Sequence, residues 1–507
     1  MNMTTLDTLR LLVLIAMLAF LAGLLVYFKK HSQWQLSKLY LPCVLFWGLV
    51  YTFVFIPFTA PDEYAHYASA YRLSNQMMFR EMTGTAYDEA GHVMMREEDT
   101  WELGTELSEE NYEEVYGRLW DMDGSARDIG YGHHYMEVAF HAYTPQAVGI
   151  TVARLLGLGQ VLTVYLGRLC NLLFFSLCGW MAVRLAPFGK MAFFGTSLLP
   201  MTLELVGSLS YDGFAIGLGM LFTAYVLHLI YEKDKIGPKQ WAILGVLLAL
   251  LAPCKMVYIP LAAMCFLIPQ EKFGSKKKFM AAAAIVAACM VVGVLIVNLN
   301  KMTSYLGETE DVIEWAGGVA GYSFSVLLRS PLTAVKVIVY TLVTRMAGYV
   351  YGMIGGNLGW LEYEVDAVLV LFLLACTILT ALAVRSENAG QKTEKNGAFV
   401  TGKVCHGMVG GEDSAVMPVS HRIVSLILCF GTVVATLLIM LLSWTPLGSP
   451  VVEGVQGRYF LPVLPLILVA FRNKKIMLQN NIDDILIGGY CVVNLLVIQG
   501  ILALVVR

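Results

Sequence analysis

The feature that most constrains the fold is a series of apolar runs, each close to the length of a membrane span. A helix needs about 20 apolar residues to cross a hydrocarbon core. The 507-residue chain is 57% hydrophobic and only 14% charged, and its mean hydropathy is +0.65. The alternating segments of roughly ten residues that mark a transmembrane barrel are not found in the sequence. The sequence therefore predicts an all-α polytopic membrane protein.

The apolar runs and the basic connectors between them predict about 12 transmembrane helices. Lys29, Lys30 and Lys38 follow the first run, and basic residues accumulate in cytoplasmic loops. This places the connector inside and the chain after Phe58, where the second run ends, outside. We interpret the N-terminal run as a retained span, because no small-residue cleavage site follows it. The predicted location is the cytoplasmic (plasma) membrane, with the active face external.

We expect a single membrane domain over residues 1–507 with four distinct segments. Residues 59–143 form a large acidic external loop without lysine. Residues 144–157 are too short to span and form an interfacial helix. Residues 299–363 form a second external loop with an amphipathic helix near 321–343. Residues 385–421, rich in Gly, Lys and Glu, form a flexible cytoplasmic loop.

The Glu-rich middle of the first loop, Glu97 to Glu114, has two interpretations. A run of charge is commonly a solvated helical face. The alternative is a lid or an acceptor-binding insert. The sequence leaves both open.

Two carboxylates open the first external loop, directly after the second apolar run. Pro61 suits the first turn of a helix, so a helix that starts there places Asp62 and Glu63 in its first turn. Helical spacing then puts both carboxylates next to His66. We expect two carboxylates and an imidazole to meet at the membrane surface. The alternative interpretation is helix capping alone.

Isolated charges recur at the same predicted face. Asp212 lies in the second external turn, Lys255 between two short apolar runs, and Arg458 at the start of a late span. A lysine in such a position is costly unless it faces a cavity or a partner. Cations can hold a phosphate, and a carboxylate can take a proton from an incoming hydroxyl. This combination suits an inverting sugar transfer from a lipid-linked phosphosugar.

An ordered set of motifs carries a family resemblance. They are Pro61-Asp62-Glu63-x-x-His66, Pro145-Gln146-Ala147-x-Gly149, Arg184-Leu185-x-Pro187-Phe188-Gly189-Lys190, Leu199-Pro200-Met201-Thr202 through Ser210-Tyr211-Asp212-Gly213, Lys255-x-Val257-Tyr258-x-Pro260 and Gln456-Gly457-Arg458-Tyr459-Phe460-x-Pro462. With this set the chain resembles the GT-C superfamily of integral-membrane glycosyltransferases, and within it a bacterial branch long known only as a domain of unknown function. The chain departs from that branch at His141-Ala142-Tyr143-Thr144, where a His-Pro-Pro-like run is expected.

The resemblance implies a GT-C-like fold and a role for each matching residue. The implied catalytic residues are Asp62, Glu63 and Asp212; the implied donor-phosphate ligands are Lys255 and Arg458; the implied substrate contacts are His66, Tyr211, Tyr459 and Gln456. The implied donor is a polyprenyl-phosphate-linked sugar. The acceptor is a cell-surface glycan, lipid or protein of the cell envelope. The sequence does not separate Asp62 from Glu63 as the base.

Cofactors and partners are less constrained by the sequence. Asp62, Glu63, His66 and Asp212 are acceptable ligands for Mg²⁺, Mn²⁺ or Zn²⁺, and His133-His134 could join them. A divalent metal therefore stays open, although a carboxylate base does not require one. A net charge of −3 argues for no particular partner. The lipid bilayer is the expected surrounding, and no nucleic-acid partner is expected.

Two other function classes compete with a transferase. A transporter or flippase of lipid-linked glycans predicts charges at mid-membrane in several spans, together with an internal repeat. A non-catalytic envelope-assembly subunit predicts that the acidic cluster serves only as a helix cap.

Overall fold

The computed structural model describes residues 5–31, 34–80, 106–122, 139–306, 312–382, 416–473 and 482–505, with short pieces at 86–87, 93–94, 384–385, 475 and 477–478. The predicted flexible loop, 385–421, falls largely outside these residues. So do His133, His134 and part of the acidic external loop.

The described chain is built from helices, and its strands are two residues long. The helices before the centre of the bundle are α1 (Thr5–Lys30), α2 (Leu36–Val54), α3 (Glu63–Met77), α4 (Glu109–Gly117), η2 (Phe140–Tyr143), α5 (Thr144–Leu155), α6 (Gln160–Leu185), α7 (Lys190–Ser197), α8 (Pro200–Val206) and α9 (Asp212–Tyr231). The later helices are α10 (Pro238–Cys254), η3 (Met256–Leu267), η4 (Gln270–Phe273), α11 (Lys276–Leu306), η5 (Glu314–Ala316), α12 (Phe324–Arg329), α13 (Pro331–Ile354), α14 (Ala367–Leu382), α15 (Val419–Trp444), η7 (Gly457–Val463), α16 (Leu464–Phe471) and α17 (Asp483–Val505).

The strands form four two-stranded pairs. Three pairs are antiparallel: β1 (Ala86–Tyr87) with β2 (Val93–Met94), β3 (Val312–Ile313) with β4 (Val319–Ala320), and β5 (Asn357–Leu358) with β6 (Tyr363–Glu364). The fourth pair, β7 (Val384–Arg385) with β8 (Met477–Leu478), is parallel.

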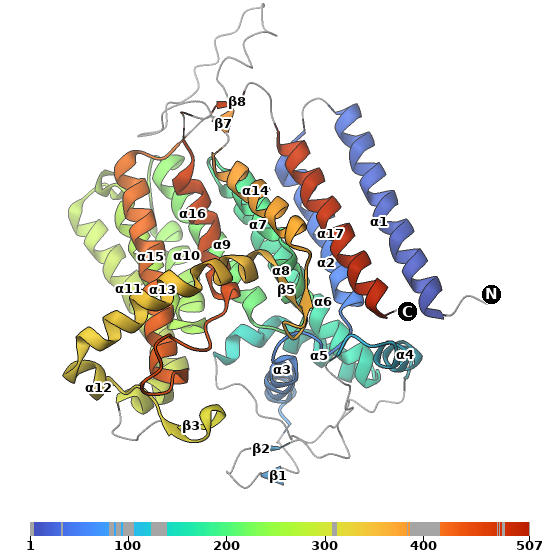
Figure 1. Ribbon diagram of the computed structural model, residues 1–507. Helices are drawn as coiled ribbons and strands as arrows, with labels where there is room; N and C mark the ends of the chain where they lie inside the picture. The colour runs from blue at the N-terminus through green and yellow to red at the C-terminus, as the bar shows by residue number, and fades with distance from the viewer. Residues whose placement is uncertain are drawn as a thin grey trace, which may run out of the picture.

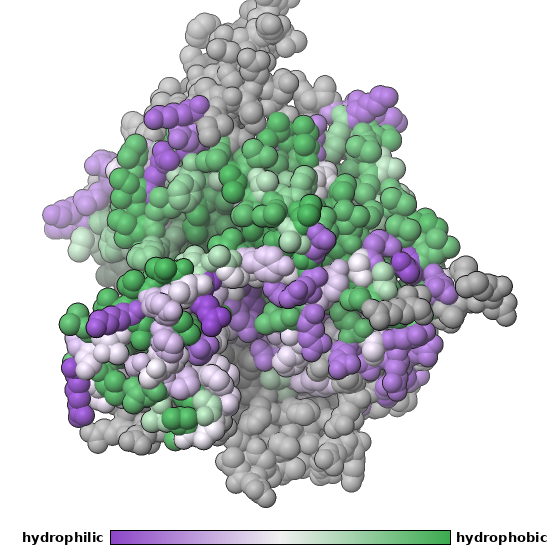
Figure 2. Space-filling model, in the orientation of Figure 1, coloured by the Kyte–Doolittle hydropathy of each residue, from purple (hydrophilic) through white to green (hydrophobic). Residues whose placement is uncertain are grey.

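Most of the helices stand side by side in one bundle (Figure 1). Among the described residues, eight helices are long and apolar enough to cross a membrane, and four shorter apolar helices accompany them. Figure 2 shows the apolar side chains gathered in the upper part of this bundle, with more polar side chains below. The prediction of an all-α polytopic membrane protein is confirmed.

Some helices begin, end or break at other residues than the apolar runs suggest. The apolar run over residues 190–207 is long enough for one helix but is broken into α7 and α8, because Pro200 cannot continue the helix that precedes it. In place of the predicted amphipathic helix near 321–343, the structure has the short α12 and then α13, which starts at Pro331 and runs to Ile354. It is one of the eight long apolar helices, yet it lies obliquely to the bundle in Figure 1.

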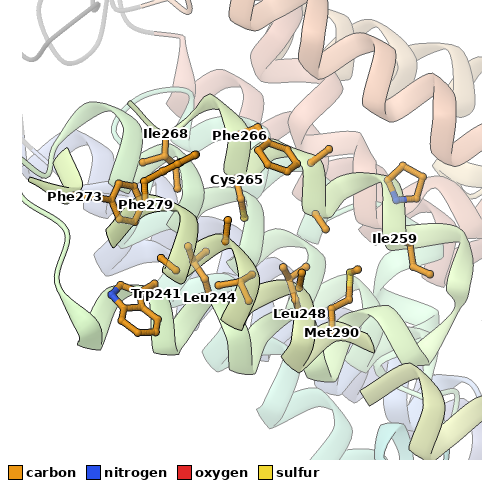
Figure 3. A pocket seen from close by; sticks show the side chains of 17 residues that line it. Trp241, Leu244, Leu248, Ile259, Cys265, Phe266, Ile268, Phe273, Phe279 and Met290 are labelled. Carbon is orange, nitrogen blue, oxygen red and sulfur yellow. The ribbon is translucent and has the colours of Figure 1, made fainter. Parts of the chain in front are cut away.

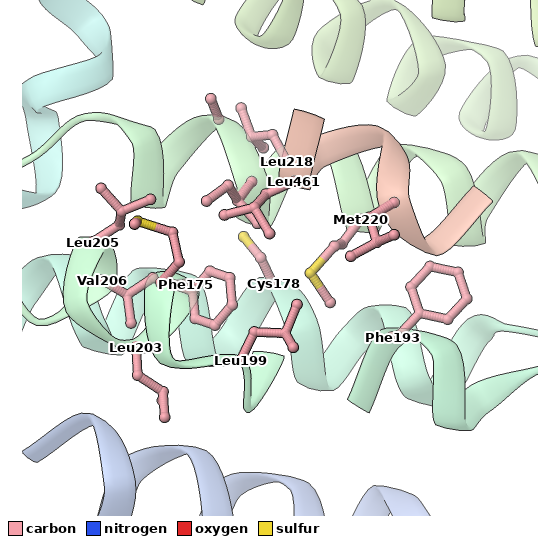
Figure 4. Packing of buried hydrophobic residues seen from close by; sticks show 14 of the residues in the cluster. Phe175, Cys178, Phe193, Leu199, Leu203, Leu205, Val206, Leu218, Met220 and Leu461 are labelled. Atoms are coloured by element: carbon pink, nitrogen blue, oxygen red, sulfur yellow. The ribbon is translucent and has the colours of Figure 1, made fainter. Parts of the chain in front are cut away.

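Helix α9 forms the centre of the bundle, and nearly its whole surface is buried. Its Gly213 and Gly217 face α6, where an added Cβ would contact Asn171 and Phe175. Small residues four apart allow the close helix approach that drives packing in a membrane. Figure 4 shows the apolar side chains around α9, including Met220, packed between neighbouring helices. The first residue of α9, Asp212, is thereby fixed at one end of the bundle.

Helices α3, α5 and η2 lie together at that same end (Figure 1). Helix α4, from the Glu-rich segment, is tied to the end of α2: the Tyr116 hydroxyl donates to the Phe53 carbonyl at 2.7 Å, and the Tyr112 hydroxyl donates to the Val54 carbonyl. The described part of this segment is therefore anchored to the bundle through its tyrosines.

Candidate functional site

Four charged side chains from distant parts of the chain meet at the end of the bundle that carries α3. The Lys255 Nζ lies 2.6 Å from Asp212 Oδ1. The Arg458 Nη2 lies 3.3 Å from Asp62 Oδ2, and its Nε lies 3.6 Å from Asp212 Oδ2. The arrangement alternates acid and base and is close to neutral in total. The structure thus brings together four of the residues that the sequence singled out.

Aromatic rings surround the lysine of this cluster. The Lys255 Nζ lies 4.0 Å from the ring centroid of Tyr459 and 5.0 Å from that of Tyr211. A cation over an aromatic face is stabilised by the ring quadrupole. The Tyr258 hydroxyl donates to the Tyr459 carbonyl at 3.1 Å, which fixes the backbone next to Arg458.

Arg458 has hydrogen-bonding capacity left over. Its side chain is only 5% exposed, and its Nε and Nη1 have no hydrogen-bond partner among the described residues. A buried N–H without a partner carries a desolvation cost, and a guanidinium presents its donors in a fork that matches an oxyanion. The Gln456 Oε1, in the segment before η7, is likewise buried and without a partner there.

Glu63 occupies a different environment from its neighbour Asp62. Its carboxylate is completely buried and accepts two hydrogen bonds from Arg168: Nε to Oε1 at 2.8 Å and Nη2 to Oε2 at 2.5 Å. It also accepts from the backbone N–H of Phe58 at 2.8 Å and of Leu209 at 2.9 Å. These four hydrogen bonds connect α3, α6 and two loops through the Glu63 carboxylate.

Arg168 completes this clamp by holding the end of α2. It donates to the carbonyls of Thr52 at 3.0 Å, Ile56 at 2.9 Å and Phe55. A buried ion pair is tolerated only when further hydrogen bonds satisfy its remaining polar atoms, and these carbonyls do so. We name Glu63 and Arg168 the buried clamp. It fixes the chain on both sides of Asp62.

Asp62 is the residue of the cluster that faces outward. Its side chain is 41% exposed, against none for Glu63. It precedes α3 and has a left-handed backbone, with φ 59° and ψ 16°, a conformation that Asp and Asn tolerate better than other side chains. The helix expected from Pro61 therefore starts two residues later, at Glu63, and Asp62 is turned away from its first turn.

The turn before α9 is held by amides and by the clamp. Asn171 Nδ2 donates to the Ser208 carbonyl at 2.9 Å and to the Ser210 carbonyl at 3.1 Å, and Gln146 Nε2 donates to the latter at 3.2 Å. These contacts, with the Leu209 N–H on Glu63, give the turn one conformation. Asp212 follows it directly.

His66 does not join the carboxylates as the helical spacing predicted. Its Nδ1 is hydrogen-bonded to the Tyr143 hydroxyl at 2.7 Å, and its ring lies edge-on to Tyr211, with the ring centroids 5.5 Å apart. Burial, with the positive charge of Arg458 nearby, lowers the pKa of His66 to about 3. His66 is therefore a neutral, buried contact of the tyrosines.

This burial predicts a pH effect on stability. Because the folded pKa lies below the ordinary value of about 6.5, only the unfolded chain takes up the proton as the pH falls from about 6.5 toward 3. The free energy of unfolding should therefore drop by about 1 kcal/mol between pH 6.5 and 5.5. Thermal melts of the purified protein across this range, compared with His66→Gln, test it. Equal pH slopes in the two proteins would contradict the assignment.

Metal ligation finds no support in the described residues. No group of three or more His, Cys, Asp or Glu side chains in this part of the chain is arranged to hold a metal ion. Glu63 is occupied by Arg168, and His66 by Tyr143.

Sequence reasoning missed Arg168, Tyr143 and Glu204. Glu204 is buried beside the cluster, and its Oε1 accepts from the Gly359 N–H at 2.8 Å. Arg168 and Glu204 both lie within apolar runs of the length of a membrane span. An ionisable residue inside such a run indicates a buried partner. Tyr143 lies where the chain departs from the family pattern, and no local pattern marks it.

Comparisons with known proteins give a family but no characterised relative. Searches among curated proteins and among solved structures gave no match. One family model matches residues 45–467, which include Asp62, Asp212, Lys255 and Arg458. The chain belongs to the family described as predicted membrane protein (DUF2142).

Proposed function

We propose that this protein is an inverting glycosyltransferase that moves a sugar from a polyprenyl-phosphate-linked donor to a hydroxyl of a cell-envelope acceptor. The observation that carries the proposal is the pairing of a half-exposed carboxylate, Asp62, with a buried guanidinium, Arg458, that has N–H groups to spare. The Asp62 carboxylate can accept a proton, and the Arg458 guanidinium can hold a phosphate. The motif resemblance to the GT-C superfamily gives the same assignment.

Each residue then has a distinct role in the reaction. Asp62 takes the proton of the acceptor hydroxyl as general base. The hydroxyl oxygen attacks the anomeric carbon, and the bond from that carbon to the phosphate oxygen breaks. Arg458 binds the donor phosphate, which is already an anion before transfer, and keeps this contact as the phosphate leaves. Attack opposite to the leaving group inverts the anomeric centre.

The other charged residues position these two. Asp212 is held by Lys255 at 2.6 Å. Its other carboxylate oxygen lies 3.6 Å from Arg458 Nε and orients the guanidinium. Glu63 has all of its contacts within the protein, so the proposal assigns it to the buried clamp and the base to Asp62. Tyr211 and Tyr459, whose rings flank Lys255, are suited to contact the sugar or its phosphate.

The distribution of buried charge favours a transferase over a transporter. Arg168 and Glu63 meet at the end of α2, and the remaining charges of the cluster lie at the same end of the bundle. A transport pathway needs polar groups along the middle of several spans. By the positive-inside rule this end faces outward, since Lys29, Lys30 and Lys276 mark the opposite end.

Arg458→Ala should weaken donor binding more than it slows the chemical step. A hydrogen bond to a charged group contributes about 1.5–3 kcal/mol, so the KM for the donor should rise about 10- to 100-fold. Arg345→Ala, which removes an exposed arginine of α13, is the matched control and should leave KM unchanged. Transfer kinetics in nanodiscs at varied donor concentration test this. An unchanged donor KM in Arg458→Ala would overturn the phosphate assignment.

A further inference from the structure

An apolar cavity lies within the bundle, away from the charged cluster. Its volume is about 410 Å³, within the range of roughly 300–1,000 Å³ that is usual for small-molecule sites. Figure 3 shows its lining, which comes from α10, η3, η4 and α11 and from Ile268 directly after η3. Every lining residue is apolar, among them Trp241, Leu248, Phe266 and Met290. Its chemistry fits a hydrocarbon chain.

One end of this cavity borders a dense group of lysines. Phe273 and Phe279, both in the lining, bracket Lys276, Lys277 and Lys278, and all three lysines are exposed. Trp241 of the lining follows Lys239 by two residues, and Lys239 is exposed as well. Glu271 is an exposed acid on this rim, and the adjoining segment carries Glu232 and Asp234 beside Lys233 and Lys235, all exposed. Basic residues are therefore in excess.

The backbone adds to this positive charge. Helices α10 and α11 pack against each other and both begin at this end, with Pro238 and Lys276. A helix N-terminus carries a partial positive charge from its free N–H groups. The lysines and two helix starts therefore converge at one end of the apolar cavity. Lipid headgroups are expected at the ends of helices that cross a membrane, and α11 is long and apolar enough to do so.

We propose that this cavity and its lysine rim, Lys239 with Lys276 to Lys278, bind an anionic glycerophospholipid. One acyl chain fills the apolar cavity, and the headgroup phosphate contacts the lysines. A zwitterionic lipid offers the same chain without the net negative charge, so the rim selects for charge. Basic groups at such a depth each contribute about 1 kcal/mol toward anionic lipids, which is about fivefold in affinity.

The lysine rim lies at the opposite end of η3 from the charged cluster, and the cavity extends along η3 from Ile259 to Ile268. Lys255 directly precedes η3, and Ile268, which lines the cavity, directly follows it. A 3₁₀-helix of 12 residues is unusually long for its kind. The bound chain packs along this helix, which stabilises the segment that presents Lys255. The proposal does not rest on the glycosyltransferase assignment.

Two pairs of matched variants test the site. Lys277→Ala with Lys278→Ala removes rim charge, and its control is Lys29→Ala with Lys30→Ala, exposed lysines at the end of α1. Ala283→Trp fills the cavity, and its control is Ala284→Trp, an exposed neighbour on α11 that does not line it. Each full-length protein is delipidated in detergent, and binding of dioleoyl-phosphatidylglycerol and dioleoyl-phosphatidylcholine is measured by native mass spectrometry and thermal shift.

The wild type and both controls should bind phosphatidylglycerol more tightly than phosphatidylcholine. The rim variant should lose about 25-fold in affinity for the anionic lipid, and Ala283→Trp should lose binding of both lipids at this site. An equal preference for the anionic lipid in all five proteins would overturn the proposal. Farnesyl phosphate is measured in the same way. If it binds, if Ala283→Trp abolishes its binding and if the rim variant retains it, the cavity holds an isoprenoid chain, and the proposal is overturned. None of these readouts requires glycosyl transfer.

Discussion

Asp62→Asn should abolish sugar transfer while leaving the protein folded. Loss of a general base lowers kcat by about 10²- to 10⁴-fold. Asn is also among the residues that tolerate the left-handed backbone found at this position, where φ is 59°. The substitution therefore removes the carboxylate charge with little added strain. Single-turnover transfer from a polyprenyl-phosphate sugar in nanodiscs measures the effect.

Asp121→Asn provides the control for this experiment. Asp121 is also an aspartate of the first loop, with a side chain 46% exposed and 3.6 Å from Arg118, and it takes no part in the cluster. It should transfer at the wild-type rate. Full activity in Asp62→Asn at equal protein level would remove Asp62 from the mechanism.

Arg168→Met should unfold the protein far more readily than an ordinary surface substitution. The change leaves the Glu63 carboxylate buried without its cation and frees three carbonyls near the end of α2. Breaking a buried ion pair from one side costs about 3–5 kcal/mol. We expect a lower melting temperature and poor recovery from membranes, whether or not substrate is present.

A double-mutant cycle on protein stability tests whether Glu63 and Arg168 act as one structural unit. Because Glu63→Gln removes the charge that Arg168 balances, the double variant should be less destabilised than the two single losses added together. Arg118→Met is the control, since its contacts to Glu114 and Asp121 are exposed and 3.6 Å long; exposed pairs contribute at most about 1 kcal/mol. Strictly additive losses would mean that the two residues do not act as a unit.

The sequence predicted the membrane class and the residues of the cluster for a clear reason. Apolar runs of span length can fold in few ways, and isolated charges beside such runs attract attention because they are expensive. Asp62, Asp212, Lys255 and Arg458 stood out on that ground, and the structure brings them within 3.6 Å of one another in successive pairs.

The contacts that Glu63 and His66 make could not be predicted from the sequence pattern. Helical spacing suggested that Glu63 and His66 meet, but tertiary packing pairs Glu63 with Arg168, 105 residues away, and His66 with Tyr143, 77 residues away. Such contacts depend on how α3, α5 and α6 pack, which local periodicity does not encode. The break between α7 and α8 was foreseeable from Pro200; the oblique course of α13 was not.

The most direct test of the central claim compares membranes from cells with and without the gene. Lipid-linked sugars and surface glycans are extracted and profiled by mass spectrometry, and the deletion is complemented with wild type or with Asp62→Asn. We expect the deletion to accumulate one polyprenyl-phosphate sugar and to lose one sugar from a surface molecule, and only the wild type to restore both. Accumulation of an intact lipid-linked oligosaccharide, with no single sugar lost, would contradict it and point to a transporter.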